Sequence, residues 1–61
     1  MYKYQREFIK FVNEKLGYKA FRHDDFADFL FCVPQKDKEE FYNEFRVVKG
    51  WSKKELEENL F

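Results

Sequence analysis

With 61 residues, the chain is long enough for one small domain, whose hydrophobic core only just offsets the entropy lost on folding. Aromatic residues make up 23% of it and supply large apolar surfaces for burial. A lone Cys excludes an intrachain disulfide, and the sequence has neither an apolar run of about 18 residues nor a signal-peptide pattern, so we expect a single soluble, cytoplasmic domain over residues 1–61.

Charge is distributed unevenly along the chain, although the net charge is zero. Residues 1–23 carry six basic and two acidic side chains, whereas residues 24–44 carry seven acidic and two basic ones. The acidic set consists of Asp24, Asp25, Asp28, Asp37, Glu39, Glu40 and Glu44. The chain is therefore a dipole in sequence, which leaves both a basic and an acidic surface available to a partner.

The first predicted helix covers residues 2–16. Its apolar positions, spaced along one broad helical face, are Tyr4, Phe8, Ile9, Phe11, Val12 and Leu16. Gly17 follows where a left-handed residue commonly ends a helix. The opposite face carries Lys3, Arg6 and Lys10, and we interpret it as a solvated outer face.

The most apolar run of the chain is residues 26–33, which we predict to form the central helix. Its core-facing positions, at helical spacing, are Phe26, Phe29, Leu30 and Val33. Asp24 or Asp25 can cap its first turn, and Pro34 limits its end, because a residue before proline avoids the α region. The flanks are apolar too, so the open question is what covers Phe31.

An alternative interpretation pairs residues 18–22 with residues 26–33 as a β-hairpin. Alternation of apolar and polar side chains fails at Leu30 and Cys32, which would make both faces of that strand apolar. We therefore predict an all-α domain of about four short helices packed around the central helix, with an α+β fold containing a hairpin at residues 18–33 as the alternative.

Two more helices are predicted after Pro34. Asp37 and Glu40 have the spacing of a capping box. The helix that they start places Phe41, Tyr42, Phe45 and Val48 on one side and ends at Gly50. Ser52 and Glu55 form a second capping box, with Trp51 placed to pack on Leu56 as a hydrophobic staple. The last helix, Lys53 to about Leu60, offers only Leu56 and Leu60 to the core.

The sequence offers little for catalysis. His23, Asp24 and Asp25 are the one cluster with metal-binding or acid–base side chains, and without a second His they are better explained as a helix start. We expect Cys32 to be packed in apolar surroundings, which makes a thiol a poor nucleophile. Neither a Gly-rich phosphate loop nor a Ser-centred nucleophile motif is present. We predict no enzyme, no cofactor and no metal site.

Aromatic residues exceed what the predicted core faces can hold. Such residues are enriched at protein interfaces, here with another protein or a second copy of the chain. The expected partner-binding residues are Phe31, Tyr42, Trp51, Leu60 and Phe61. We expect a small non-enzymatic interaction module that binds and modulates a larger protein, in the style of a phage or mobile-element factor acting on a host machine. The acidic set would mimic nucleic acid in a partner's basic groove.

Two short stretches resemble peptides that bind sliding clamps. Residues 57–61 end in Leu60-Phe61 and are similar to the tail peptides that bind the bacterial clamp, although Glu57 replaces the Gln of that motif. Residues 5–11 resemble the eukaryotic and archaeal peptide in spacing, but their aromatic residues are also expected in the core. The first resemblance implies the bacterial sliding clamp as a candidate partner.

The alternative function is nucleic-acid binding by a helical domain, through Lys3, Arg6 and Lys10 on the first helix. Short helices joined by tight turns also build helix-turn-helix domains. Such domains are usually basic overall, however, and a recognition helix that begins at residues 38–40 would bring carboxylates to phosphates. The sequence therefore favours a protein partner over nucleic acid, and it predicts no membrane contact.

Overall fold

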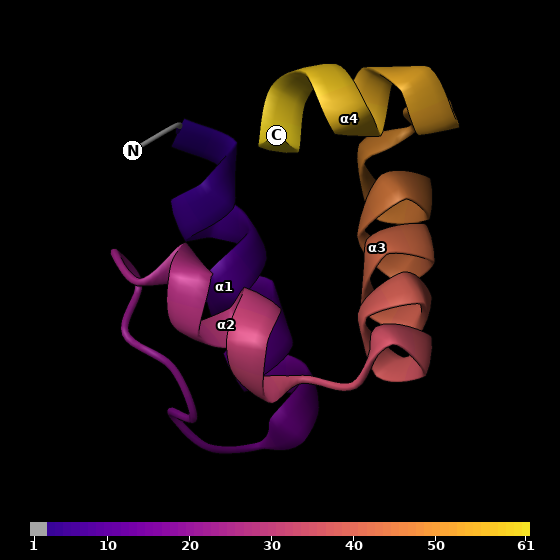
Figure 1. The fold of residues 1–61 in the computed structure, drawn as a ribbon. Coiled ribbons are helices and arrows are strands. Elements are labelled where there is room, and N and C mark those ends of the chain that lie inside the picture. Colours follow the sequence, from indigo (N-terminus) through magenta and orange to yellow (C-terminus); the bar gives the residue numbers. More distant parts are fainter. Residues whose placement is uncertain (1–2) are drawn as a thin grey trace.

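The structure, a computed structural model, describes residues 3–61 and has four α-helices among them (Figure 1). Their bounds are α1 Lys3–Leu16, α2 Phe26–Cys32, α3 Gln35–Lys49 and α4 Lys53–Leu60. No strand occurs within residues 3–61, so the all-α prediction is confirmed and the alternative hairpin at residues 18–33 is not formed. Tyr2, expected in the first helix, lies outside the described residues.

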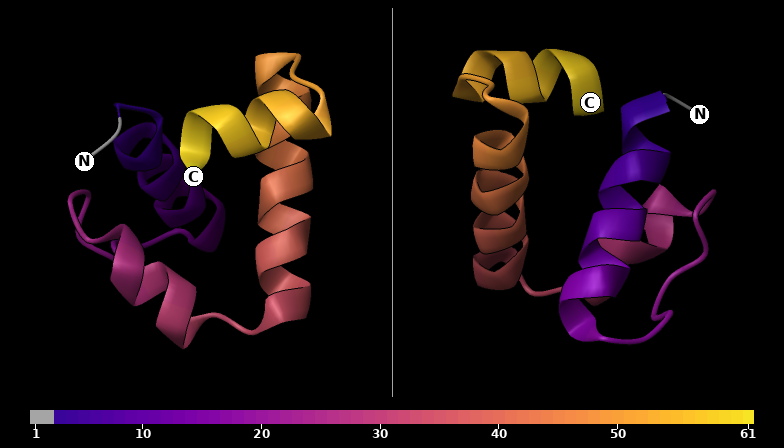
Figure 2. Two further views of the ribbon diagram at one scale, coloured as in Figure 1. Left: turned by 45° about the horizontal axis from the view of Figure 1, so that its top comes forward. Right: turned by 180° about the vertical axis from the view of Figure 1, so that it is seen from behind.

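The helix that contacts all the others is α1. It packs against α2, α3 and α4, and α3 also packs against α4. In Figures 1 and 2, α3 runs alongside α1 in the opposite direction, and α4 turns back from the end of α3 toward the start of α1. There, Gln5 Nε2 donates a hydrogen bond of 2.7 Å to the carbonyl oxygen of Leu60. By these contacts α1 holds the central position that was predicted for α2.

Aromatic rings from three helices meet in the core. Phe8 of α1 and Phe29 of α2 are fully buried, and their rings meet edge to face at 5.0 Å. Phe45 of α3 approaches Phe8 in the same way at 5.2 Å. Such pairs each contribute about 0.5–1.5 kcal/mol beyond the area that they bury. As predicted, α4 closes the core with Leu56 and Leu60.

Local signals fix most of the helix ends. Gly17 and Gly50 have φ angles of 82° and 71°, the left-handed conformation predicted for both. Asp25 caps α2 by accepting a hydrogen bond of 3.0 Å from the amide of Asp28. The capping box of α4 is also present, since the Glu55 amide donates to Ser52 Oγ at 3.2 Å and the Ser52 amide donates to Glu55 Oε1 at 3.0 Å.

The start of α3 differs from the prediction. The helix begins at Gln35, with Pro34 as its N-cap and no capping hydrogen bond from a side chain, so the predicted box of Asp37 and Glu40 is wrong. The fixed φ of Pro34, −58°, already suits entry into a helix, and the chain turns helical directly after it. Asp37 lies in the first turn instead, where its charge opposes the helix dipole.

A buried asparagine holds the connection between α1 and α2. Asn13 is the only buried polar residue among those described. Its Oδ1 accepts hydrogen bonds from the amides of Ala20 at 3.0 Å and Phe21 at 3.1 Å, and its Nδ2 donates to the Phe21 carbonyl at 2.9 Å. This segment is therefore anchored in its middle although it has no regular structure. None of the helices described has the length and apolar character needed to span a membrane.

Candidate partner-binding site

The outer face of α2 presents a large aromatic ring to solvent. Phe31 is 89% exposed, the highest value among the large apolar residues described. It is held in place because Phe26 and Phe29, on the opposite side of the same helix, are buried in the core. Nothing in residues 3–61 covers Phe31, which answers the question posed by the sequence.

Three carboxylates come shortly before this ring in the chain. Asp24 and Asp25 directly precede α2, and Asp28 lies on its first turn, one helical turn before Phe31. Asp24 and Asp25 are exposed, and Asp28 is half-buried. We call these three acidic residues together with Phe31 the α2 outer face. It combines one apolar anchor with three negative charges.

Cys32 is exposed at the end of α2, so the expectation that it is packed in the core is wrong. A seven-residue helix directs only one side inward, and that side is occupied by Phe26 and Phe29. The Cys32 Sγ instead donates a hydrogen bond of 3.1 Å to Asp28 Oδ1. This hydrogen bond is the main reason that the pKa of the thiol is raised, followed by desolvation and by the charges of Asp28 and Asp25.

We expect Asp28→Asn to speed the alkylation of Cys32 by iodoacetamide at pH 8. The thiolate is the reactive form, and the Asp28 carboxylate disfavours it by raising the thiol pKa. Removing that negative charge lowers the pKa and increases the thiolate fraction at a fixed pH. The rate is measured by mass spectrometry between pH 7 and 10, with Asp37→Asn as a control that removes an exposed carboxylate from α3. Equal rates in the Asp28 variant and the parent would contradict the prediction.

The rest of the acidic set lies on α3, where Asp37, Glu39, Glu40 and Glu44 are all exposed. Glu39 Oε1 accepts a hydrogen bond from Gln35 Nε2 at 3.5 Å. Glu44 forms an ion pair with Lys15 of α1, 3.5 Å apart. The acidic set is thus divided between the start of α2 and the surface of α3.

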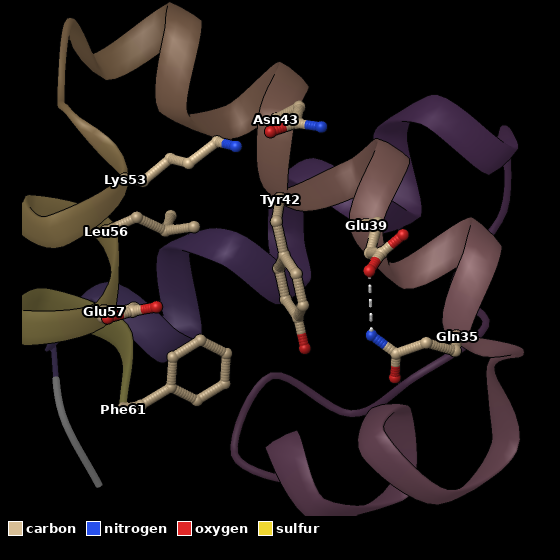
Figure 3. A pocket seen from close by; sticks show the side chains of 8 residues that line it. All are labelled: Gln35, Glu39, Tyr42, Asn43, Lys53, Leu56, Glu57 and Phe61. Carbon is tan, nitrogen blue, oxygen red and sulfur yellow. Dashed lines mark hydrogen bonds between the residues drawn. The ribbon is translucent and has the colours of Figure 1, made fainter.

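A pocket of about 410 Å³ lies between α3 and α4 (Figure 3). Its lining consists of Gln35, Glu39, Tyr42, Asn43, Lys53, Leu56, Glu57 and Phe61. Phe61 is 49% exposed, and its ring lies 5.4 Å from that of Tyr42. Partial burial raises the pKa of Tyr42 to about 12. The pocket thus brings together two of the predicted partner-binding residues.

The other two predicted partner-binding residues pack in or against the core. Leu60 is fully buried. Trp51 packs edge to face against Tyr4 at 4.9 Å and Phe45 at 5.7 Å. Leu60 is therefore not available for docking. Trp51 and Tyr42 are half-buried, and Phe31 and Phe61 are the exposed members of the set.

Both clamp-like stretches are part of the packed helices. Residues 57–60 lie in α4 with Leu60 buried, and residues 5–11 lie in α1 with Phe8 fully buried. A clamp that takes these stretches as extended peptides would have to detach them from the core. The bridge from Gln5 to the Leu60 carbonyl ties the two stretches to each other.

Sequence reasoning missed a largely apolar groove between α1 and α3, with a volume of about 350 Å³. Its lining consists of Phe11, Val47 and Val48 together with Lys15, Asn43 and Glu44. Val47 is 69% exposed, and Val48, predicted in the core, is 70% exposed. Leu16, also predicted on the inner face of α1, is exposed at the end of that helix. The available signal was Val47, an apolar residue about 100° away from Val48 and therefore off the predicted inner face of α3.

The basic residues of the nucleic-acid alternative, Lys3, Arg6 and Lys10, are all exposed on α1, as predicted for an outer face. Their spacing places them on one side of the helix.

The cluster of His23, Asp24 and Asp25 was considered for metal binding or catalysis. Residues 3–61 contain no group of three or more His, Cys, Asp or Glu side chains that could hold a metal ion. His23 is half-buried, and Asp24 pairs with Arg22 at 3.7 Å.

The surfaces described above are the candidate binding sites of the molecule. The α2 outer face carries an exposed ring and three carboxylates. Two hollows accompany it, the α3–α4 pocket with its mixed polar and apolar lining and the apolar α1–α3 groove. Comparison with known protein families, curated proteins and solved structures finds no match to this chain.

Proposed function

We propose that this chain is a non-enzymatic protein-binding module that modulates a larger protein and docks through the α2 outer face. The observation that carries the proposal is the 89% exposure of Phe31. Burial of a Phe side chain in a partner contributes about 1.5–3 kcal/mol. Because Phe26 and Phe29 already fix the helix, little backbone freedom is lost when the ring docks, although the Phe31 side chain itself becomes ordered.

The carboxylates beside Phe31 define the chemistry of the partner. Asp24, Asp25 and Asp28 favour a surface that has an apolar cleft bordered by Lys or Arg. A groove that binds nucleic acid has such a border, and a module that fills it competes with the nucleic acid. A phage or mobile-element factor that inhibits a host nucleic-acid-binding protein would work in this way. Electrostatic attraction makes its association depend on salt.

The test is affinity capture from a bacterial lysate, with Phe31→Ser compared with the parent chain. We expect the parent to recover a basic protein whose yield falls at least about tenfold with Phe31→Ser, because an aromatic anchor typically contributes 2 kcal/mol or more. Asp28→Asn should weaken capture mainly at low salt. Val47→Ser is the matched control, since it also removes an exposed apolar side chain but lies on α3.

The same variants separate the competing partners. Equal recovery with the parent and Phe31→Ser would overturn the proposal, and loss with Val47→Ser alone would assign docking to the α1–α3 groove. Sedimentation at several concentrations tests self-association, and a dimer abolished by Phe31→Ser would make a second copy the partner. Capture of the sliding clamp that persists with Phe31→Ser would favour the clamp-like stretches instead.

A further inference from the structure

A third hollow lies on the basic part of the molecule, and it shares only Asp24 with the α2 outer face. It is open to solvent, has a volume of about 300 Å³ and is lined by Arg6, Lys19, Arg22, His23 and Asp24. Arg6 comes from α1, whereas the other four belong to the connection between α1 and α2. Three cationic side chains and an imidazole thus line one hollow. We call it the basic pocket.

The basic pocket has more positive charge than its own carboxylate can balance. Asp24 Oδ1 lies 3.7 Å from Arg22 Nε, and both side chains are largely exposed, so this ion pair is weak. Within residues 3–61, Arg6 and Lys19 form no ion pair with a carboxylate. With His23 neutral, the five residues carry a formal charge of +2. The pocket is therefore complementary to a divalent anion.

The chain holds the cationic residues of the connection in place. Lys19 and Arg22 flank Ala20 and Phe21, whose amides both donate to Asn13. The Phe21 ring also packs against Phe29 of the core, with centroids 5.7 Å apart. The backbone that carries Lys19 and Arg22 is thus already ordered in the folded chain, so less conformational entropy is lost on binding. This distinguishes the basic pocket from scattered surface lysines.

We propose that the basic pocket binds a phosphate group. A guanidinium presents parallel N–H donors that match two phosphate oxygens, and Arg6 and Arg22 can each supply such a pair while Lys19 adds a point charge. A carboxylate ligand has one negative charge and two oxygens, which leaves some of these donors unused. The lining contains no aromatic side chain on which a base would stack, so the pocket recognises the phosphate and not the remainder of the ligand.

Two sources can provide this chemistry, a small phosphate compound or the backbone of a polynucleotide. Lys3 and Lys10 lie on the same side of α1 as Arg6 and would contact further phosphates of a long chain. Inorganic phosphate and a 12-nucleotide DNA strand of mixed sequence are the two probes. Their relative affinity, and its dependence on Lys3 and Lys10, distinguishes the sources.

The experiment follows backbone amide signals by NMR while sodium phosphate is added at constant ionic strength maintained with sodium chloride. We expect saturable shifts at residues 19–24. The double variant Arg6→Gln, Lys19→Gln should weaken binding at least about tenfold, because hydrogen bonds to charged groups are the strong ones. Lys53→Gln with Lys54→Gln is the control, since it removes the same charge from exposed positions on α4 and should change the affinity less than about twofold.

Each outcome decides the proposal. Absence of saturable shifts would overturn the proposal. Equal weakening of phosphate binding by the two double variants would also overturn it, because the loss would then be a general effect of charge. If phosphate binds, and DNA binds tenfold more tightly in a way that needs Lys3 and Lys10, the proposal is supported and the ligand is a polynucleotide. If phosphate and DNA bind with equal affinity, the proposal is supported and the ligand is a small phosphate compound. Phe31→Ser should leave phosphate binding unchanged, so this proposal and protein docking through Phe31 fail independently.

Discussion

Replacement of Phe29 by Ala is expected to lower the free energy of unfolding by about 3–5 kcal/mol. The ring is fully buried, and the rings of Phe8, Phe21, Phe26, Phe41 and Tyr42 surround it, with centroids 5.0 to 6.2 Å away. Its removal leaves a cavity that rigid neighbouring rings cannot fill. Domains of this size rarely have more than about 3–5 kcal/mol of stability, so the variant should be largely unfolded at 25 °C.

Phe31→Ala is the matched control for this prediction. It makes the same substitution on the same helix, but at a ring that is 89% exposed, so we expect a change within about 0.5 kcal/mol. Urea denaturation followed by circular dichroism at 222 nm measures both variants. Similar losses in the two would show that the core is not centred on the buried side of α2.

Asn13→Ala should lower the free energy of unfolding by about 2–3 kcal/mol, the second largest effect that we expect. Asn13 satisfies three backbone groups at Ala20 and Phe21, and its loss leaves half-buried donors and an acceptor without their protein partner. The segment that connects α1 and α2 should then lose its fixed conformation. The basic pocket would be affected too, because Lys19 and Arg22 belong to this segment.

Hydrogen exchange gives the sharpest measurement for Asn13. In the Asn13→Ala variant, the amides of Ala20 and Phe21 should exchange faster by a larger factor than the amides of the α1 interior, because local anchoring and global stability are lost together. Asn43→Ala, at an exposed position of α3, is the control. It should change appreciably neither the exchange of the Ala20 and Phe21 amides nor that of the α1 interior. Unchanged protection of Ala20 and Phe21 in the Asn13 variant would contradict the role assigned to this side chain.

The parts of the fold that were predictable from sequence depend on short-range chemistry. Gly17, Gly50 and the Ser52–Glu55 box mark helix ends through contacts within a few residues, and the structure has all three. The start of α3 was not predicted, because Pro34 and the capping pattern gave competing signals and the proline prevailed. Exposure of Cys32 and Val48 depends on which side of each helix meets a neighbour, and spacing alone does not specify that in so small a core.

The same distinction between short-range patterns and contacts of distant residues applies to the candidate sites. Phe31 was identified because the flank of a strongly apolar helix lacked an evident cover. Trp51 and Leu60 were expected at an interface as well as beside the core, and in the structure both pack in or against the core. Their burial depends on α4 folding back on α1, a contact between residues that are about as far apart as the chain allows. The basic pocket was also out of reach, because it depends on how the connection between α1 and α2 folds back beside Arg6. Asn13, which anchors that connection, has no distinguishing sequence pattern.

The exposed position of Cys32 gives the molecule a native attachment point next to Phe31. As the sole Cys in the sequence, it accepts a single probe without any engineered thiol, provided the pH is raised enough to form the thiolate. A small fluorophore there would lie at the edge of the α2 outer face and report contact through its emission. A photoreactive group at the same sulfur would turn a transient encounter into a covalent product whose mass identifies the bound surface.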